Sequence, residues 1–253
     1  MGTELGKERR FTGLVLAGGR GSRFPSEHGH LHPKVLRHAL GRPIIDYVLD
    51  TLNDAGVDGI TLVIGYGANE VRRAIGPRVE YAVQHEQHGS GHAANCAKEA
   101  YQNYEGSLVV MCGDSPMFAA ETVRGLVEKH ETSGAAVTLA SAVLDDPFGY
   151  GRILRDSDGA IRGVVEEKCA NEPQRAVREV NGGAYCFDAP WLFGNIEKMA
   201  LNDAHEYNLT DMVRVAVEQE LTVSAVKCDP KELLGVNTPE QLAAVEEILR
   251  GRG

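Results

Sequence analysis

The stretch LVLAGGRGSRFPSEHGHLHPK, residues 14–34, decides the fold class of this chain. It opens inside a continuous apolar run, Thr12–Ala17, which is typical of a strand that is buried on both faces. The glycines that follow allow backbone N–H groups to face a ligand closely, and loops of this kind bind phosphate. A helical turn after the loop would add the positive end of its dipole. The stretch therefore predicts a buried strand that leads into a phosphate-binding loop.

Three cations extend the loop: Arg20, Arg23 and Lys34. An arginine can hold phosphate oxygens through two hydrogen bonds, whereas a lysine acts as a point charge. The stretch matches neither the GxxxxGK[ST] nor the GxGxxG pattern, so its glycines alone leave a purely structural strand–turn–helix open.

Around this stretch, apolar runs of strand length alternate with helical patterns. Pro43–Ala55 carries a helical apolar stripe and ends before Gly56. The further strands expected in the first half are Gly59–Ile64, Val79–Val83 and Ser107–Met111, and the further helices are Ala68–Ile75, Ser90–Tyr101 and Ala119–His130. Alternation of this kind predicts a parallel sheet with helices on both faces.

The pattern becomes mixed after about residue 135. The expected strands are Ala136–Val143, Arg152–Leu154, Ala160–Glu167 and Val177–Phe187, and the expected helices are Pro190–Met199, Leu209–Glu218 and Pro239–Leu249. We expect a single domain over residues 1–253, in which a first half (about 11–135) and a second half (about 136–253) share one sheet. The predicted fold is α/β and Rossmann-like, with a mostly parallel mixed sheet flanked by helices.

Composition narrows the classes of protein. The 253 residues are 43% hydrophobic and 25% charged, which is an ordinary globular mixture, and the net charge is −10. An acidic balance argues against nucleic-acid or membrane-surface partners. Five widely spaced cysteines without a CxxC pair favour a reducing compartment. The polar N-terminus and the absence of a long apolar run lead us to expect no signal peptide, no membrane span and a cytoplasmic location.

A set of motifs carries a family resemblance. The string LxAGGxGxR…PK resembles the signature of the nucleoside-triphosphate:sugar-1-phosphate nucleotidyltransferases, or pyrophosphorylases. Six further motifs, in the same order, resemble the N-terminal uridylyltransferase domain of the GlmU family: QHEQHGSGHA (84–93), GDSP (113–116), DPFGYGRI (146–153), VEEK (165–168), EVNGG (179–183) and GVN (235–237). The resemblance implies the nucleotide-diphospho-sugar transferase type of fold.

The resemblance also implies an enzyme that joins a nucleoside triphosphate to a sugar 1-phosphate and releases pyrophosphate, closest to one using UTP and N-acetylglucosamine 1-phosphate. Arg23 would hold the β- and γ-phosphates, Lys34 would serve the transferred phosphate, and Asp114 and Asn237 would bind Mg²⁺, the implied cofactor. The implied nucleotide-binding residues are Leu16, Ala17, Gly18, Gly19, Gly21, Ser22, Gln84, Gly89 and Ser90. The implied sugar-binding residues are Gly151, Glu166 and Asn181. The partners would be small substrates, with the chain a monomer or small homo-oligomer.

The residues themselves support some of these roles and leave alternatives to others. Asp114 closes an apolar strand, where ligands bind in α/β sheets, and Mg²⁺ prefers oxygen ligands of this kind. The amide of Gln84 can match one donor and one acceptor on a base. Ser90, however, could simply cap a helix, and Asn237 could cap the helix that begins at Pro239. Glu166 could be a solvated strand end.

The histidines His28, His30 and His32 lie between Arg23 and Lys34. Solvated loop residues, a metal site and a pH-sensitive lid are the three interpretations of this pattern.

Departures from the GlmU pattern leave the substrates open. Gly18 replaces an alanine, Ser90 a threonine, and Cys112 and Asn208 each replace a tyrosine, so the same chemistry with GTP, CTP, dTTP or another sugar phosphate is an alternative. A GT-A glycosyltransferase is a second alternative, although its DxD motif would require an acid that Gly113-Asp114-Ser115 lacks. A non-catalytic regulatory subunit is a third. No hexapeptide repeats follow Asn237, so we expect no acetyltransferase activity.

Overall fold

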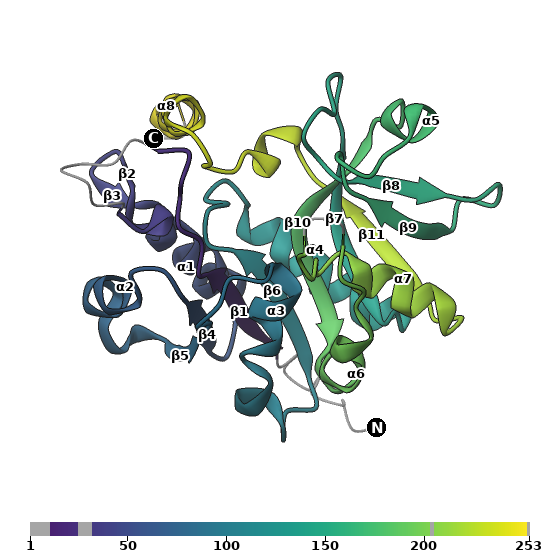
Figure 1. Cartoon of the computed structure of the whole chain (residues 1–253), viewed down its shortest axis with the longest axis horizontal. Coiled ribbons are helices and arrows are strands. Elements are labelled where there is room, and N and C mark those ends of the chain that lie inside the picture. The colour runs from purple at the N-terminus through teal and green to yellow at the C-terminus, as the bar shows by residue number, and fades with distance from the viewer. Residues whose placement is uncertain (1–10, 25–31, 203–204, 252–253) are drawn as a thin grey trace, which may run out of the picture.

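A nine-stranded mixed sheet runs through the computed structural model of the chain, which describes residues 11–24, 32–202 and 205–251 (Figure 1). Its strands are β1 (Phe11–Ala17), β4 (Ile60–Ile64), β5 (Glu80–Val83), β6 (Ser107–Cys112), β7 (Val137–Val143), β8 (Arg152–Arg155), β9 (Ile161–Val165), β10 (Glu179–Asp188) and β11 (Val223–Lys227). A separate ribbon pairs β2 (His38–Ala39) with β3 (Arg42–Pro43).

Helices connect these strands. The α-helices are α1 (Ile44–Ala55), α2 (Ala68–Ile75), α3 (Ser90–Asn95), α4 (Ala120–Ser133), α5 (Glu172–Arg175), α6 (Ala189–Asn195), α7 (Asp211–Glu218) and α8 (Pro239–Arg250). The 3₁₀ turns are η1 (Lys34–Leu36), η2 (Gly76–Arg78), η3 (Lys98–Tyr101), η4 (Ile196–Lys198) and η5 (Pro230–Leu233). In the parts of the chain that the structure describes, no helix is both long and apolar enough to cross a membrane.

The strand order is β11-β7-β10-β6-β1-β4-β5. β1 is parallel to both of its neighbours, β4 and β6, and β4 is parallel to β5. β10 is antiparallel to β6 and β7, while β11 is parallel to β7. The β8–β9 hairpin joins β10 through the pair Val180–Arg152. The predicted α/β class with a mostly parallel mixed sheet is therefore confirmed, and the sheet continues from the first half into the second.

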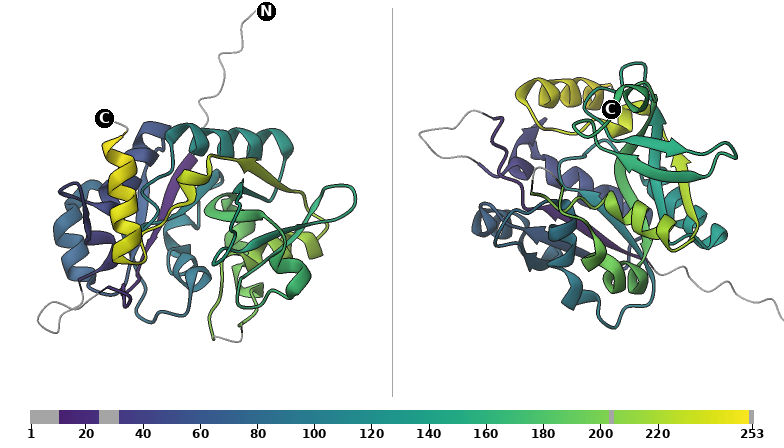
Figure 2. Two further views of the ribbon diagram at one scale, coloured as in Figure 1. Left: turned by 90° about the horizontal axis from the view of Figure 1, so that it is seen from above. Right: turned by 45° about the vertical axis from the view of Figure 1, so that its right-hand side comes forward.

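The central strand β1 explains why helices cover both faces. Leu14 and Val15 are fully buried and point to opposite faces, because successive side chains of a strand alternate. Val15 belongs to the apolar cluster formed with α1, α2 and α4. Leu14 belongs to the cluster formed with α3, α6 and α7. A third, smaller cluster joins α8 to the β2–β3 ribbon (Figure 2).

Two predicted helices are shorter than expected. The helix expected over Ser90–Tyr101 ends at Asn95 and is followed by η3, and the one expected over Pro190–Met199 divides into α6 and η4. The tighter 3₁₀ turn brings the Tyr101 ring onto Phe193, with centroids 5.4 Å apart, while the Tyr101 hydroxyl donates to the Gly13 carbonyl. Tertiary packing thus overrides the helical periodicity.

Three strands were not predicted, namely β2 and β3 of the separate ribbon and β11 of the main sheet. β11 escaped detection because its apolar pattern is short and only its second residue, Ser224, is buried. No helical turn follows β1 within residues 18–24, where the chain instead makes a turn in which the Phe24 N–H bonds the Gly21 carbonyl. Gly21 has a left-handed φ of 69°, which directs the chain away from helix. Among the described residues, the next helical turn is η1, which begins at Lys34.

Leu14→Ala should lower the free energy of unfolding by about 3 kcal/mol, because it leaves a cavity beside the central strand. The matched control is Leu221→Ala, at a side chain that is 40% exposed, and it should cost less than about 0.5 kcal/mol. Urea unfolding followed by circular dichroism measures both values. Equal losses in the two variants would contradict the central place assigned to β1.

Candidate active site

The loops that follow β1, β4 and β5 meet at the carboxyl edge of the sheet. Gly18 is so close to its neighbours that a Cβ there would lie 2.6 Å from Gln84 Oε1. A Cβ on Gly65 would lie 2.9 Å from the Gly18 carbonyl oxygen, which also accepts the Tyr66 N–H at 3.1 Å. Glycine at positions 18 and 65 therefore allows the loops to approach this closely, whereas a Cβ at Gly19 would make only an ordinary contact, 3.9 Å from Lys34. Ligands bind at this edge in open α/β sheets.

Lys34 lies between two residues from distant parts of the chain. Its ammonium forms an ion pair with the Asp114 carboxylate and donates to Asn237 Oδ1 at 3.0 Å. The side chains of Lys34 and Asp114 are only 17% and 16% exposed. The Val236 N–H bonds the Asp114 carbonyl at 2.8 Å, so the segment that carries Asn237 is fixed to the end of β6. The Lys34 ammonium thus contacts two residues that are 80 and 203 positions away along the chain, Asp114 and Asn237.

Asn237 does not cap the last helix. Thr238 is the N-cap of α8, and its hydroxyl accepts the Gln241 N–H at 3.3 Å. The Gln241 side chain in turn accepts the Asn237 backbone N–H at 2.8 Å. Because Thr238 and Gln241 cap this end of α8, the Asn237 side-chain oxygen is available to accept from the Lys34 ammonium.

The pair Asp114 and Asn237 suits a magnesium ion. Mg²⁺ is usually held by one or two protein oxygens, with phosphates and water completing its shell. A carboxylate and an amide oxygen that already converge on one cation fit this donor set. Across residues 11–24, 32–202 and 205–251, no group of three or more His, Cys, Asp or Glu side chains is arranged to hold a metal alone.

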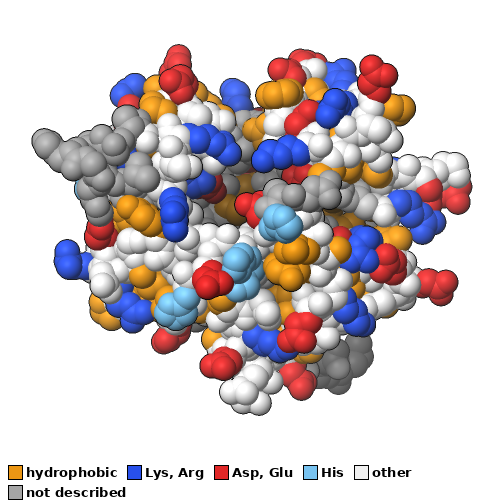
Figure 3. All heavy atoms as spheres, in the orientation of Figure 1, with side chains coloured by type: hydrophobic (Ala, Val, Ile, Leu, Met, Phe, Trp, Pro, Cys, Tyr) orange, Lys and Arg blue, Asp and Glu red, His pale blue; other side chains and the backbone are white. Residues whose placement is uncertain are grey.

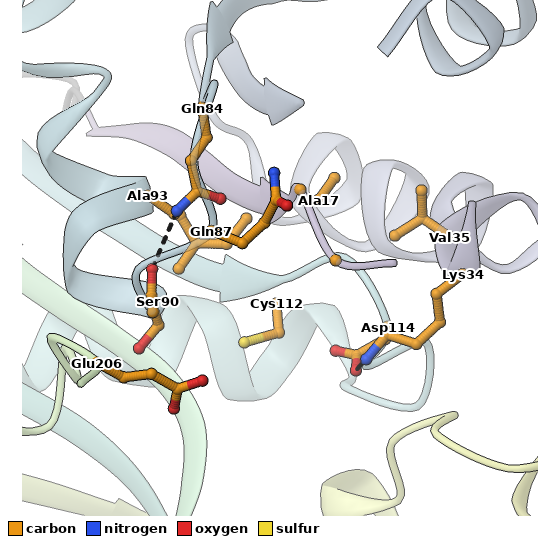
Figure 4. A pocket seen from close by; sticks show the side chains of 14 residues that line it. Ala17, Lys34, Val35, Gln84, Gln87, Ser90, Ala93, Cys112, Asp114 and Glu206 are labelled. Atoms are coloured by element: carbon orange, nitrogen blue, oxygen red, sulfur yellow. Dashed lines mark hydrogen bonds and ion pairs between the residues drawn. The ribbon is translucent and has the colours of Figure 1, made fainter. Parts of the chain in front are cut away.

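A pocket of about 230 Å³ opens beside this group (Figure 4). It is lined by Leu16, Ala17, Gly18, Gly19, Lys34, Val35, Gln84, Gln87, Gly89, Ser90, Ala93, Cys112, Asp114 and Glu206. Gly21 and Ser22 do not line it. Burial, reinforced by the charge of Asp114, raises the pKa of the Cys112 thiol to about 12. The thiol is therefore neutral at pH 7 and serves the pocket as a small wall residue.

Gln84 is 4% exposed and uses its amide nitrogen within the protein. Its Nε2 donates to the Gly89 carbonyl at 3.2 Å (Figure 4). The same nitrogen lies 3.1 Å from His92 Nδ1. Its Oε1 faces Gly18 and accepts no hydrogen bond from the described residues. Because the nitrogen of this amide is engaged within the protein, the oxygen is the part that remains for a ligand, and base binding by Gln84 stays a prediction.

Ser90 fastens a distant loop instead of capping α3. The N-cap of α3 is Gly89, and the Ser90 hydroxyl accepts the Leu209 N–H at 2.9 Å. The Tyr207 N–H bonds the His88 carbonyl, and the Gly91 N–H bonds the Tyr207 carbonyl. Residues 207–209 are therefore held against the start of α3.

A larger cavity of about 640 Å³ lies on the side of the second half. It is lined by Arg23, Phe148, Gly149, Glu166, Glu167, Lys168, Cys169, Asn202, Glu206 and Asn208. Glu206 borders both cavities, so the two adjoin. Figure 3 shows acidic and basic side chains around a hollow in the middle of the face seen in Figure 1. Arg23 lines this larger cavity and not the pocket beside Lys34.

The three predicted sugar-binding residues lie together. The Asn181 N–H bonds the Gly151 carbonyl at 2.8 Å, and a Cβ on Gly151 would lie 3.5 Å from the Glu166 carboxylate. Of the three, Glu166 lines this larger cavity, and its carboxylate accepts the Thr210 hydroxyl at 2.9 Å, so it is no solvated strand end. Asn181 Nδ2 donates to the buried Tyr185 hydroxyl at 2.7 Å.

Glu167 fixes the rim of the larger cavity. Its carboxylate accepts from Arg152, which is only 2% exposed, at 2.6 Å, and from the Gly149 N–H at 3.2 Å. The Arg152 guanidinium, together with the Gly149 hydrogen bond, lowers the pKa of Glu167 against the opposing effect of burial. The DPFGYGRI motif is thus anchored by the second acid of VEEK.

The predicted site residues leave out five that line the pocket beside Lys34, namely Val35, Gln87, Ala93, Cys112 and Glu206, of which Gln87 and Glu206 are strongly polar. Gln87 was visible as the second glutamine of QHEQ; its Oε1 accepts from Arg20 Nε at 3.3 Å, which leaves its amide nitrogen toward the pocket. Glu206 belongs to an irregular loop without a periodic signal. Of the predicted histidine group, His28 and His30 lie outside the described residues, and His32 Nδ1 is 3.7 Å from the Glu70 carboxylate.

Comparison with known proteins agrees with this geometry. The nucleotidyl transferase family pattern matches residues 12–231. The chain is 43% identical over 243 residues to the bifunctional protein GlmU of Heliobacterium modesticaldum and 42% identical over 241 residues to that of Geobacillus thermodenitrificans. These matches cover 95% and 94% of this chain but 52% of each relative, so the chain spans about half the length of the curated relatives it matches.

The fold also resembles a solved structure. A putative glucose-1-phosphate thymidylyltransferase from Bacillus anthracis superposes with a TM-score of 0.77 over 95% of both chains, at 18% identity. The expected fold type and the resemblance to the uridylyltransferase domain of the GlmU family are confirmed.

Glu167→Gln should destabilise the protein at pH 7 by an amount that shrinks as the pH falls. A carboxyl group whose pKa is lowered by folding stabilises the protein above its ordinary value, near 4.5, and loses that effect as the pH falls through its folded value. Urea unfolding between pH 7 and pH 3 measures the difference from wild type. Glu99→Gln, at an exposed position, is the control and should show no such trend. A constant gap for Glu167→Gln would contradict the assigned ion pair.

Proposed function

Because the chain belongs to the nucleotidyl transferase family, we propose that it joins a nucleoside triphosphate to a sugar 1-phosphate, most closely UTP to N-acetylglucosamine 1-phosphate, and releases pyrophosphate. The observation that carries the proposal is the Lys34 ammonium held between Asp114 and Asn237, beside the Gly18-Gly19 loop. This places one fixed cation and two metal-ligating oxygens next to a pocket lined by a glycine loop. Such an arrangement suits a polyphosphate chain.

The proposed reaction is an in-line displacement. A phosphate oxygen of the sugar 1-phosphate forms a bond to the α-phosphorus, and the bond from that phosphorus to the bridging oxygen of the β-phosphate breaks, so pyrophosphate leaves. The attacking oxygen is already ionised at pH 7, so no general base is required. Positioning and charge neutralisation then supply the catalysis.

The two cationic side chains of the site are assigned to different phosphate groups. We assign Lys34 to the α-phosphate and the incoming phosphate, since it stands between the nucleotide pocket and Asp114. We assign Arg23 to phosphate charge from the side of the larger cavity. When bound to Asp114 and Asn237, Mg²⁺ supplies neutralisation of the charge on the phosphates. Lys34 would then exchange these two partners for phosphate oxygens.

The nucleobase is assigned to the glutamine side of the pocket. Gln84 offers a carbonyl oxygen and Gln87 an amide nitrogen. An acceptor beside a donor matches the N3–H of uracil and one of its carbonyl oxygens. The N3 of cytosine is itself an acceptor and would face the Gln84 oxygen unfavourably. This complementarity supports uridine over cytidine.

The sugar is assigned to the larger cavity. Glu166 is held by Thr210 with its carboxylate at the cavity wall, which suits hydrogen bonds from sugar hydroxyls. Gly151 and Asn181 pack directly behind it. We keep Asn181 as the residue closest to the 2-substituent of the sugar, acting next to the Glu166 carboxylate.

Asp114→Asn should reduce turnover by two or more orders of magnitude without unfolding the protein, because it removes the charged metal ligand. Pyrophosphate release with UTP, N-acetylglucosamine 1-phosphate and Mg²⁺ measures turnover, and excess chelator should abolish it in wild type. Asp54→Asn, at an exposed position on α1, is the matched control. Near-normal activity of Asp114→Asn, or in chelator, would rule out the proposed metal site.

Among UTP, CTP, dTTP and GTP, UTP should give the highest kcat/KM by at least tenfold over CTP, about 1.4 kcal/mol in the transition state. The measurement is pyrophosphate release from each triphosphate against a panel of sugar 1-phosphates. A tenfold preference for CTP or GTP would refute the base assignment. No pyrophosphate from any pair would refute the proposed reaction itself and favour a non-catalytic role.

A further inference from the structure

We propose that His92 is a positioning residue that fixes the side-chain amide of Gln84, so that Gln84 presents its oxygen and never its nitrogen to the nucleobase. The inference rests on the proposed function, because it concerns how the same pocket selects its base. His92 lies on α3, one turn from Gly89, and does not line the pocket. Its role would be exerted entirely through Gln84.

The orientation of the Gln84 amide follows from its partners. One end of the amide lies 3.2 Å from the Gly89 carbonyl oxygen. A carbonyl oxygen can only accept a hydrogen bond, so the atom that faces it is the nitrogen. The same nitrogen lies 3.1 Å from His92 Nδ1. The two hydrogens of the amide are therefore directed at Gly89 and His92, and Oε1 is turned toward Gly18.

The same contacts fix the state of His92. An amide nitrogen can only donate hydrogen bonds, so His92 Nδ1 must be the acceptor of the Gln84 amide. A ring nitrogen that accepts carries no proton, so this contact requires the imidazole tautomer with its proton on Nε2. That Nε2 lies 4.0 Å from Cys96 Sγ. The edge of the His88 ring packs on His92, with centroids 5.2 Å apart, while Glu86 pairs with His88. The surroundings hold the ring in place without competing for Nδ1.

Loss of the His92 acceptor would leave the Gly89 carbonyl as the only partner of the amide nitrogen. Gln84 is 4% exposed, so the amide hydrogen that His92 no longer accepts cannot turn to bulk water. With one hydrogen bond in place of two, the amide would populate rotated states in which its nitrogen, and not its oxygen, faces the base. Uracil and cytosine differ at N3 as donor and acceptor, so a rotating amide loses the means to distinguish them. Nothing in this change reaches Lys34 or the larger cavity.

The test is a series at one position. His92→Asn keeps an acceptor oxygen near the position of Nδ1. His92→Gln places its acceptor oxygen one bond farther from the backbone, and His92→Ala removes the acceptor. For each variant, kcat/KM is measured with UTP and with CTP, KM is measured for the sugar 1-phosphate, and UTP binding is measured by calorimetry without sugar phosphate. Thermal unfolding shows that each variant is folded.

We expect His92→Ala and His92→Gln to bind UTP about tenfold more weakly and to lose about tenfold of the UTP-over-CTP preference. The KM for sugar 1-phosphate should stay unchanged, and His92→Asn should restore both base properties. Equal loss of UTP and CTP activity in all three variants would show a merely structural role and overturn the inference. That result would leave the proposed function standing, because the latter fails only if wild type releases no pyrophosphate.

Discussion

A single ammonium group joins the parts of this site. Lys34 is tied to Asp114 at the end of β6 and to Asn237 before α8, and all three side chains are mostly shielded from water. Removing one charge from such a pair would leave the other poorly solvated, so the partners depend on one another. The same three groups are those that a polyphosphate and its metal would require. The contact that holds Lys34 to Asp114 and Asn237 therefore also places a cation and two oxygen ligands where a polyphosphate and its metal would bind.

The sheet provides the rigid frame for this contact. β1 is buried on both faces by two separate helix layers, and its neighbours β4 and β6 run parallel to it. Parallel strands end at a common edge, so the loops after them meet without any long connection. Gly18 and Gly65 permit these loops to touch. Antiparallel β10 then extends the sheet into the second half, and the larger cavity there adjoins the pocket beside Lys34.

Hydrogen-bond direction gives the pocket its chemical character. The Gln84 amide nitrogen is hydrogen-bonded to the Gly89 carbonyl and to His92, and the Gln87 oxygen accepts a hydrogen bond from Arg20. What remains for a ligand is one acceptor, the Gln84 oxygen, and one donor, the Gln87 nitrogen. Ser90 and Glu167 also line the cavities, and their hydrogen bonds to Leu209 and to Arg152 hold the cavity walls in place.

The resemblance of the chain's motifs to the GlmU family, and no periodic signal, singled out Lys34, Asp114 and Asn237. The sequence by itself determined the α/β class and most of the strands and helices of the first half, because buried strands, amphipathic helices and glycine loops leave signals that depend only on neighbours along the chain. It missed the β2–β3 ribbon and β11, extended two helices too far, and gave no sign that Ser90 bonds Leu209 or that the Gln84 nitrogen bonds Gly89. Those features depend on contacts such as Tyr101 with Phe193 and Ser90 with Leu209, which join segments far apart in sequence. Only the tertiary structure decided which amide hydrogens were already used, because a hydrogen bond is set by the distance between two atoms in space.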